Sequence, residues 1–288
     1  MRSKATYALL AAFSAVLLGV LSEGLLFAAP AEKGGCVMLP GARGIAFIRG
    51  EKWKFPYLVN GLVSMWDGEW NAGVRMHNAN ASTWKDLFGG YDLTLGSTST
   101  LKWGENYLST DGDYCAYNMN FPHSLMGSEW TCECVYRLKQ GGSNYKALFG
   151  ARAGGGLAAY GLNYYSPNYT GGWNMGIGQD RGDIAISANP SLSDLTSQDK
   201  INYLVLSCHS NKISAGANGP FTVTVNGASV ATTGRGFAIG RGYGSFSGRA
   251  SSRCLKADVY TMRIYSRKLI DAEVAANYAV DKARFNLP

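Results

Sequence analysis

The sequence predicts an all-β domain built as a sandwich of two antiparallel sheets, and three observations carry this prediction. Glycine accounts for 37 of the 288 residues, while 12% of residues are aromatic and only 16% are charged. Short strand-like runs separated by glycine-rich turns recur from Tyr57 to the C-terminus. Helical spacing is confined to the last residues. This composition excludes a mainly disordered chain, and the glycines argue against a helical bundle.

Residues 1–31 predict a signal peptide. Arg2 and Lys4 precede an uncharged stretch from Tyr7 to Ser22, and Ala29-Pro30-Ala31 has the small-x-small form that signal peptidase cleaves. The alternative is a retained membrane anchor, in which Leu25 to Ala29 extends the apolar stretch at the cost of burying a glutamate. We therefore expect a secreted or cell-surface protein, which contacts a membrane only if this segment is not cleaved.

Residues 32–56 follow as a Gly/Pro/basic stretch without a clear period, which predicts a linker or N-terminal arm. Residues 57–288 show no break in composition, so we expect them to form one domain. The chain carries a net charge of +7, and its basic excess lies between Arg235 and Pro288. That excess indicates a solvated basic face, or alternatively a surface that attracts acidic glycans. Export argues against nucleic acid as a partner.

Within the domain, residues 131–138 predict the clearest strand, because polar residues alternate there with Cys132, Cys134, Tyr136 and Leu138. Such alternation is typical of a strand with one buried face. Further strands are expected at 201–208, 221–225 and 262–265, with a hairpin turn at Asn226-Gly227. A short helix is predicted to begin with Asp271 as its N-cap. Its apolar positions are Val274, Tyr278 and Phe285.

Six cysteines in an exported chain suggest disulfides, but the spacing does not choose a pairing. Cys132 and Cys134 lie two apart on one strand, so they share a face and would not pair with each other. Together with Cys208 they could instead be buried thiols. The three histidines are scattered and paired CxxC motifs are lacking, so zinc is not predicted.

Three segments resemble parts of a known family. The first is Trp66-Asp67-Gly68-Glu69-Trp70-Asn71-Ala72-Gly73 with His77 and Trp84 to Gly89. The second is Phe221 to Gly227, and the third combines Asp258 with Met262 to Leu269 and Asp271 to Val274. In order and spacing they resemble the laminin G-like domains of the concanavalin A-like lectin/glucanase superfamily, as found in bacterial surface and phage-associated proteins. This resemblance implies a jelly-roll sandwich. It leaves the function open, because such domains bind sugars or proteins, hydrolyse glucans or serve as structural modules.

The enzymatic possibility depends on a pair of carboxylates. Retaining glycosidases need two carboxyl groups about 5 Å apart. The resemblance implies a Glu-x-Asp-x-Glu strand motif for laminarinase-like enzymes, and the nearest match is Glu129 to Glu133, where Thr131 stands in place of the aspartate. No catalytic residue is therefore predicted, and Glu133 is expected to face solvent.

An aromatic run predicts a carbohydrate site. Flat sugar faces pack on aromatic rings while amides hydrogen-bond the hydroxyls. The candidate residues are Tyr160, Tyr164, Tyr165, Tyr169, Trp173 and Asn174. The alternative is that these rings cover a sheet edge or fill the core, as aromatic residues of β-proteins often do.

Asp67, Asp86 and Asp258 are weak candidates for a structural calcium site, which the resemblance also implies for some members. Tyr260 stands where some members carry an acidic residue, so no cofactor is predicted. Trp66, Trp84 and His77 are expected to pack the first loop onto the sandwich.

Together these features predict an exported, non-catalytic module that binds a glycan or surface polysaccharide at a cell or particle surface. The first alternative is a structural subunit of a surface or phage-like protein assembly. A laminarinase-like hydrolase is the second.

Overall fold

The computed structural model describes residues 57–125, 128–139, 146–150, 163–165, 174–176, 184–185, 189–226, 235–242, 247–250 and 254–288. The predicted signal peptide and linker lie outside these residues, as does the hairpin turn at Gly227. Within the described ranges no helix is both long and apolar enough to cross a membrane.

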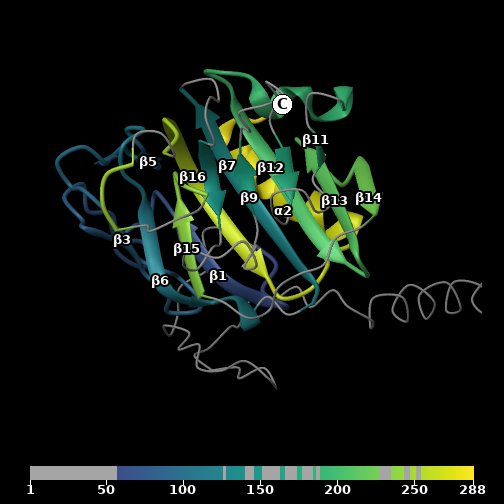
Figure 1. The fold of residues 1–288 in the computed structure, drawn as a ribbon, viewed down its shortest axis with the longest axis horizontal. Coiled ribbons are helices and arrows are strands. Elements are labelled where there is room, and N and C mark those ends of the chain that lie inside the picture. Colours follow the sequence, from purple (N-terminus) through teal and green to yellow (C-terminus); the bar gives the residue numbers. More distant parts are fainter. Residues whose placement is uncertain are drawn as a thin grey trace, which may run out of the picture. The chain divides into compact units, whose positions relative to one another are not determined.

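Two antiparallel sheets form the domain, and the predicted sandwich is confirmed (Figure 1). The first sheet has the strand order β14 (Val223–Asn226), β13 (Lys212–Ala217), β12 (Ile201–His209), β7 (Trp130–Leu138), β16 (Ala257–Tyr265), β5 (Leu108–Ser109) and β4 (Lys102–Trp103), with β1 (Leu62–Asp67) also paired to β16. The second sheet has the order β11 (Ile184–Ala185), β10 (Asn174–Gly176), β9 (Asn163–Tyr165), β8 (Ala147–Gly150), β15 (Arg235–Ile239), β6 (Ala116–Pro122), β3 (Leu93–Leu95) and β2 (Thr83–Trp84). Two 3₁₀ helices, η1 (His123–Leu125) and η3 (Pro190–Thr196), and the C-terminal helix α2 (Asp271–Phe285) complete the described elements.

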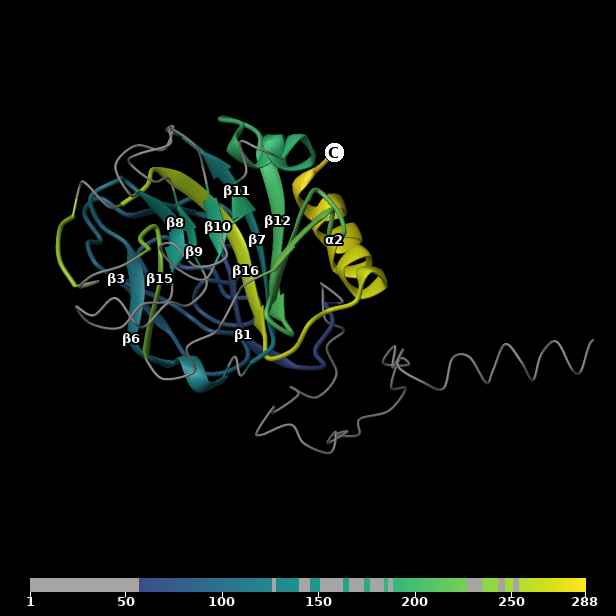
Figure 2. The ribbon, with the colours of Figure 1, turned by 45° about the vertical axis from the view of Figure 1, so that its right-hand side comes forward.

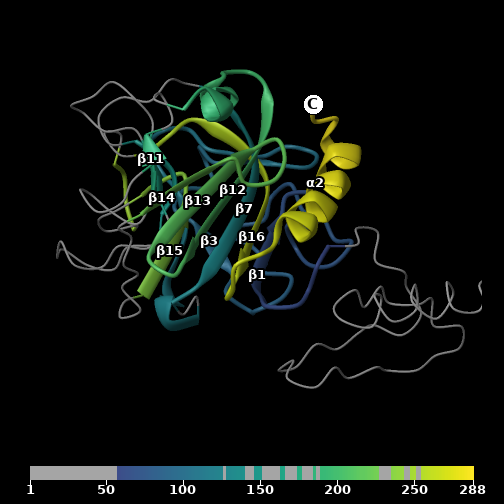
Figure 3. The same ribbon diagram turned by 90° about the vertical axis from the view of Figure 1, so that its right-hand side faces the viewer.

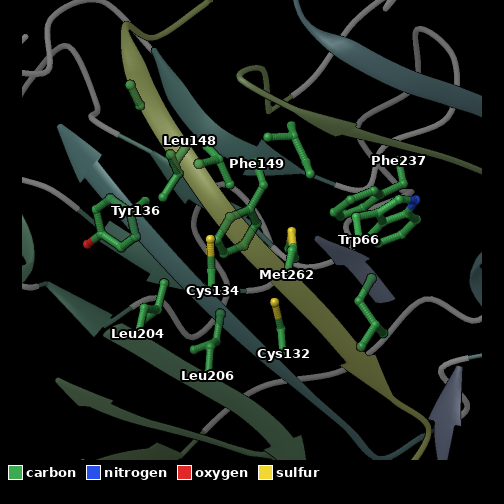
Figure 4. Close-up of a cluster of buried hydrophobic side chains, with 14 of the residues drawn as sticks. Trp66, Cys132, Cys134, Tyr136, Leu148, Phe149, Leu204, Leu206, Phe237 and Met262 are labelled. Atoms are coloured by element: carbon green, nitrogen blue, oxygen red, sulfur yellow. The ribbon is translucent and has the colours of Figure 1, made fainter. Parts of the chain in front are cut away.

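The main core lies between the two sheets (Figure 4). From β7, Cys132, Cys134 and Tyr136 point into it, as the alternating pattern predicts. Trp66 of β1 stacks on Phe237 of β15 with ring centroids 5.2 Å apart, so this pair joins the two layers. Apolar burial between layers is the main favourable term in such a fold.

Burial of β7 differs from the prediction in one respect. Thr131, Glu133 and Val135, which face away from the main core, are also fully buried. The reason is α2, which lies against β12, β7 and β16 on the side away from β15 and β3 (Figures 2 and 3). A second hydrophobic cluster fills the space between the helix and the first sheet, and includes Val135, Tyr203 and Val274. The sequence pattern of β7 predicts one buried face, but the strand is buried on both faces.

Helix α2 begins one residue earlier than predicted, with Ile270 rather than Asp271 as its N-cap. Because an isoleucine side chain cannot accept a hydrogen bond, Glu273 supplies the local stabilisation. Its carboxylate accepts from the Ile270 N–H at 3.0 Å and is held by a bidentate pair with Arg267 at 2.7 and 2.8 Å. Asp271 instead adds a negative charge to the first turn, where it favours the helix dipole.

We expect Glu273→Ala to lower the free energy of unfolding by about 1 kcal/mol at neutral pH. Partial burial alone would raise the pKa of Glu273, but the hydrogen bonds from Arg267 and Ile270 outweigh it and lower the pKa in the fold. A lowered pKa means that this stabilisation is complete above the ordinary glutamate pKa and is lost as the pH falls through the folded value. In urea unfolding, the difference in the free energy of unfolding between wild type and Glu273→Ala should therefore become smaller as the pH falls towards about 3. The exposed Glu105→Ala is the control, and a difference that stays constant with pH would contradict this assignment.

Candidate functional site

The acid pair of a hydrolase is the first arrangement to test. Glu129 is exposed and precedes β7, whereas Glu133 is completely buried beneath α2. The two glutamates therefore do not share an open groove. The expectation that Glu133 faces solvent is wrong, because the helix covers the outer face of β7.

Glu133 is held in place by three hydrogen-bond donors. The Tyr203 hydroxyl donates to Oε1 at 2.6 Å, while Arg263 Nε and Asn277 Nδ2 donate to Oε2 at 2.8 and 2.9 Å. Burial raises the pKa of Glu133, and the Arg263 guanidinium and the Tyr203 hydroxyl offset this only in part. A carboxyl group with a raised pKa is a candidate general acid when it lines a cleft. Here it is enclosed by protein, so its role is structural.

Arg263 is the centre of this buried cluster. Besides Glu133 it pairs through its two terminal nitrogens with the Asp281 carboxylate of α2, and its guanidinium carbon lies 4.0 Å from the centroid of the Tyr57 ring. Burial alone would lower the pKa of Arg263, but the Asp281 and Glu133 carboxylates raise it, so the side chain stays charged. This cluster fastens α2 to the first sheet.

A second arginine, Arg284 of α2, is paired with one of the calcium candidates. Arg284 donates to both carboxylate oxygens of Asp67 at 2.7 and 3.1 Å, and to the Tyr57 hydroxyl at 2.7 Å. Because a guanidinium already neutralises the buried Asp67, this carboxylate serves an ion pair in the structure.

The two other calcium candidates are likewise engaged. Asp86 accepts backbone N–H bonds from Met65, Phe88 and Tyr91 at 2.9 to 3.0 Å. Asp258 is paired with Arg137 and with Lys139, whose Nζ lies 2.6 Å from Oδ1. In the part of the chain that the structure describes, no three His, Cys, Asp or Glu residues come together in a group that could hold a metal ion. The expectation of no cofactor, with calcium as a weak candidate, stays a prediction.

Three of the six candidate residues of the predicted carbohydrate site belong to the second sheet. Tyr164 and Tyr165 belong to β9, and Asn174 begins β10, where it is in register with Tyr165. On its other side β9 pairs with β8, so that Tyr164 is opposite Phe149. The backbone of the two strands thus brings three of the six candidates together. Tyr160, Tyr169 and Trp173 lie outside the described residues.

Two aromatic residues of the first segment, Trp66 and Trp84, take strand positions rather than lying in a loop. Trp66 and Trp84 are fully buried in β1 and β2. Trp84 Nε1 donates to the Asp67 carbonyl at 3.0 Å, and His77 Nδ1 lies 3.2 Å from the Gly68 carbonyl oxygen. His77 therefore contacts the backbone of the first segment, within which Gly68 lies.

Sequence reasoning missed the residues that join α2 to the sheet. Arg263 belongs to β16, whereas Asn277 and Asp281 belong to α2, and neither composition nor periodicity indicates that the strand and the helix meet at these residues. One signal was available: Arg263 stands directly between Met262 and the pair Ile264-Tyr265, in a segment whose pattern predicts a strand. A charge in a buried strand predicts a buried partner.

No family model matches the chain, and neither does any curated protein. Solved structures share its fold. Trypanosoma rangeli sialidase in complex with 2,3-difluorosialic acid matches 76% of this chain with a TM-score of 0.54 at 18% identity, and the botulinum neurotoxin serotype D binding domain matches 76% with a TM-score of 0.52 at 10% identity. The match covers 33% of the sialidase and 51% of the neurotoxin domain, so this chain corresponds to about a third of the sialidase chain. At these identities the likeness concerns the fold.

Proposed function

We propose that the chain is an exported, non-catalytic β-sandwich module of the laminin G-like type that binds a glycan at a cell or particle surface. The ligand is placed on the second sheet, at β9, β10 and the aromatic residues that adjoin them in sequence. The observation that carries the proposal is the unequal covering of the two layers. Helix α2 covers the outer face of the first sheet, and in the described ranges no helix covers the outer face of the second (Figure 3).

Two further observations support binding rather than hydrolysis. Glu133 is the nearest match to a catalytic glutamate, and it is buried in an ion pair with Arg263. On the second sheet, by contrast, Met119 of β6 is 39% exposed and Asn120 is exposed as well. Amide and aromatic side chains suit the hydroxyl groups and the flat face of a sugar.

A glycan array probed with the full chain tests this proposal. The probes should include laminarin-type β-glucans, and also sialylated glycans because sialic acid is bound by the sialidase that shares the fold. We expect retention on at least one glycan class without release of sugar. Retention should persist in EDTA, because Asp67 and Asp258 are already paired with basic side chains. Loss of retention in EDTA would show that calcium takes part.

The competing function is hydrolysis, and it predicts a different result. A laminarinase-like enzyme would release reducing sugar from laminarin, and a sialidase would release free sialic acid from sialosides. Glu133→Gln should then stop the laminarin reaction. Release of either sugar at a rate that scales with protein concentration would overturn the non-catalytic assignment. If the protein binds none of the glycans on the array, the binding proposal is wrong.

A further inference from the structure

Two of the five described cysteines meet away from the main core. Cys115 immediately precedes β6 of the second sheet, and Cys254 lies in the connection that leads from β15 into β16 of the first sheet. Both are completely buried, and with Ala238 they form a small hydrophobic cluster of their own. Their side chains are hydrogen-bonded to each other.

The backbone holds these two thiols in place from several sides. Cys254 forms β-bridges with Ala147 and Arg241, and the Gly96 N–H donates to the Cys115 carbonyl at 2.9 Å. Gly240, the neighbour of Arg241, lies so close that a side chain there would come within 3.7 Å of the Cys115 α-carbon. The contact between the sulfurs is thus built into the fold.

The remaining described cysteines have no such neighbour across the sheet. On β12, Leu206 and Leu204 stand opposite Cys132 and Cys134, and on β16 their partners are Ile264 and Met262. Cys208 is in register with Trp130 and Ile213. Among the thiols that the structure describes, Cys115 and Cys254 are therefore the pair positioned to react.

We infer that Cys115 and Cys254 form a disulfide when the chain folds in the presence of a disulfide oxidant, and that this bond ties the second sheet to the entry of β16 in the first. In the reaction the thiolate of one cysteine attacks the oxidant disulfide and releases one thiol. The second cysteine then attacks the mixed disulfide and releases the other. Overall the two cysteines lose two protons and two electrons, and the oxidant is reduced to two thiols.

The local electrostatics identify the attacking sulfur. The hydrogen bond from Cys115 lowers the pKa of Cys254 in spite of burial, and the nearby Arg241 acts in the same direction. The same bond, together with burial, raises the pKa of Cys115. Of the two sulfurs, Cys254 is therefore the one favoured to form the thiolate, and thiolates are the nucleophiles of disulfide exchange.

The span of the proposed bond indicates a large effect on stability. Cys115 and Cys254 enclose most of the domain sequence, including β6 to β15. Closing so long a loop restricts the unfolded chain strongly, and it also holds the turn before β16 against the start of β6. Such a bond persists in an oxidising compartment, whereas a reducing compartment keeps the pair as thiols.

The test is to refold the full chain in a glutathione redox buffer and, in parallel, in dithiothreitol, and then to block free thiols by alkylation. Peptide mapping of the oxidised wild type should show Cys115 linked to Cys254, with both alkylated in the reduced sample. The oxidised protein should melt roughly 10 °C higher than the reduced one. Cys208→Ala, which removes a different buried thiol, should keep this difference, and Cys254→Ala should abolish it.

Peptide mapping of the wild type decides the question even if a variant fails to fold. Alkylation of both Cys115 and Cys254 after oxidative refolding would overturn the inference. So would either cysteine being found linked mainly to another partner.

Discussion

Replacing Arg263 by methionine is expected to lower the free energy of unfolding by about 3–5 kcal/mol. Methionine fills a similar volume, but it leaves the Glu133 and Asp281 carboxylates buried without the cation that both contact. An unpaired buried charge is more costly than the lost attraction alone, because water cannot reach it. Urea unfolding followed by tryptophan fluorescence measures this effect through the midpoint of the transition.

The matched control is Arg249→Met, which removes the same side chain from an exposed ion pair. A terminal nitrogen of Arg249 lies 2.9 Å from Oδ2 of Asp113, and the Arg249 side chain is 67% exposed. We therefore expect the free energy of unfolding to change by less than about 1 kcal/mol. A second control combines Glu133→Gln with Arg263→Met. This double variant should be more stable than the sum of the two single effects allows, because the glutamine carries no charge and only Asp281 is then left without its cation. Additive effects, or a small loss in Arg263→Met itself, would show that the cluster does not hold the helix in place.

The double substitution Tyr165→Ala with Trp173→Ala is expected to reduce glycan retention by on the order of 100-fold. Each ring should contribute about a factor of ten through contact with a sugar face, and tenfold corresponds to about 1.4 kcal/mol. Frontal affinity chromatography on the glycan class selected by the array measures the loss. The placement of Tyr165 in β9, paired with Asn174 of β10, supports this choice of variant.

The control for this experiment is an aromatic residue on the other layer. Tyr278 belongs to α2 and packs on Tyr203 with ring centroids 5.1 Å apart. The helix lies on the side of the first sheet away from the second sheet (Figure 3). Tyr278→Ala should therefore leave retention unchanged. Unchanged retention in the double variant, with its fold intact by circular dichroism, would place the ligand elsewhere.

The fold could be predicted from the sequence because its signals are local. Alternating residues in β7 and the apolar run of β12 indicate strands, and Val274 and Phe285 are buried in α2 at the predicted positions. The buried outer face of the first sheet could not be predicted in the same way. A glutamate is tolerated at the buried position 133 because Arg263 and Asn277 hydrogen-bond it. Both partners lie more than a hundred residues away in the sequence, and only the folded chain brings them to Glu133.

The candidate site is less predictable for a related physical reason. An aromatic run identifies residues that are able to contact a sugar, but the same residues also stabilise sheets. The pairing of β9 with β10 places Tyr164, Tyr165 and Asn174 on adjoining strands, which a linear pattern cannot determine. Which glycan binds depends on how these side chains are arranged around it, and the glycan array measures this choice directly.

Because α2 covers the side of the first sheet that faces away from the second, the domain can be immobilised through this helix. Ala276 lies on the exposed side of this helix, away from the Arg263 cluster. A biotin linked to a cysteine introduced there would immobilise every molecule on a sensor chip in one orientation, with the opposite layer turned towards the flowing sample. Such a sensor would screen polysaccharides without the immobilisation itself blocking β9 and β10.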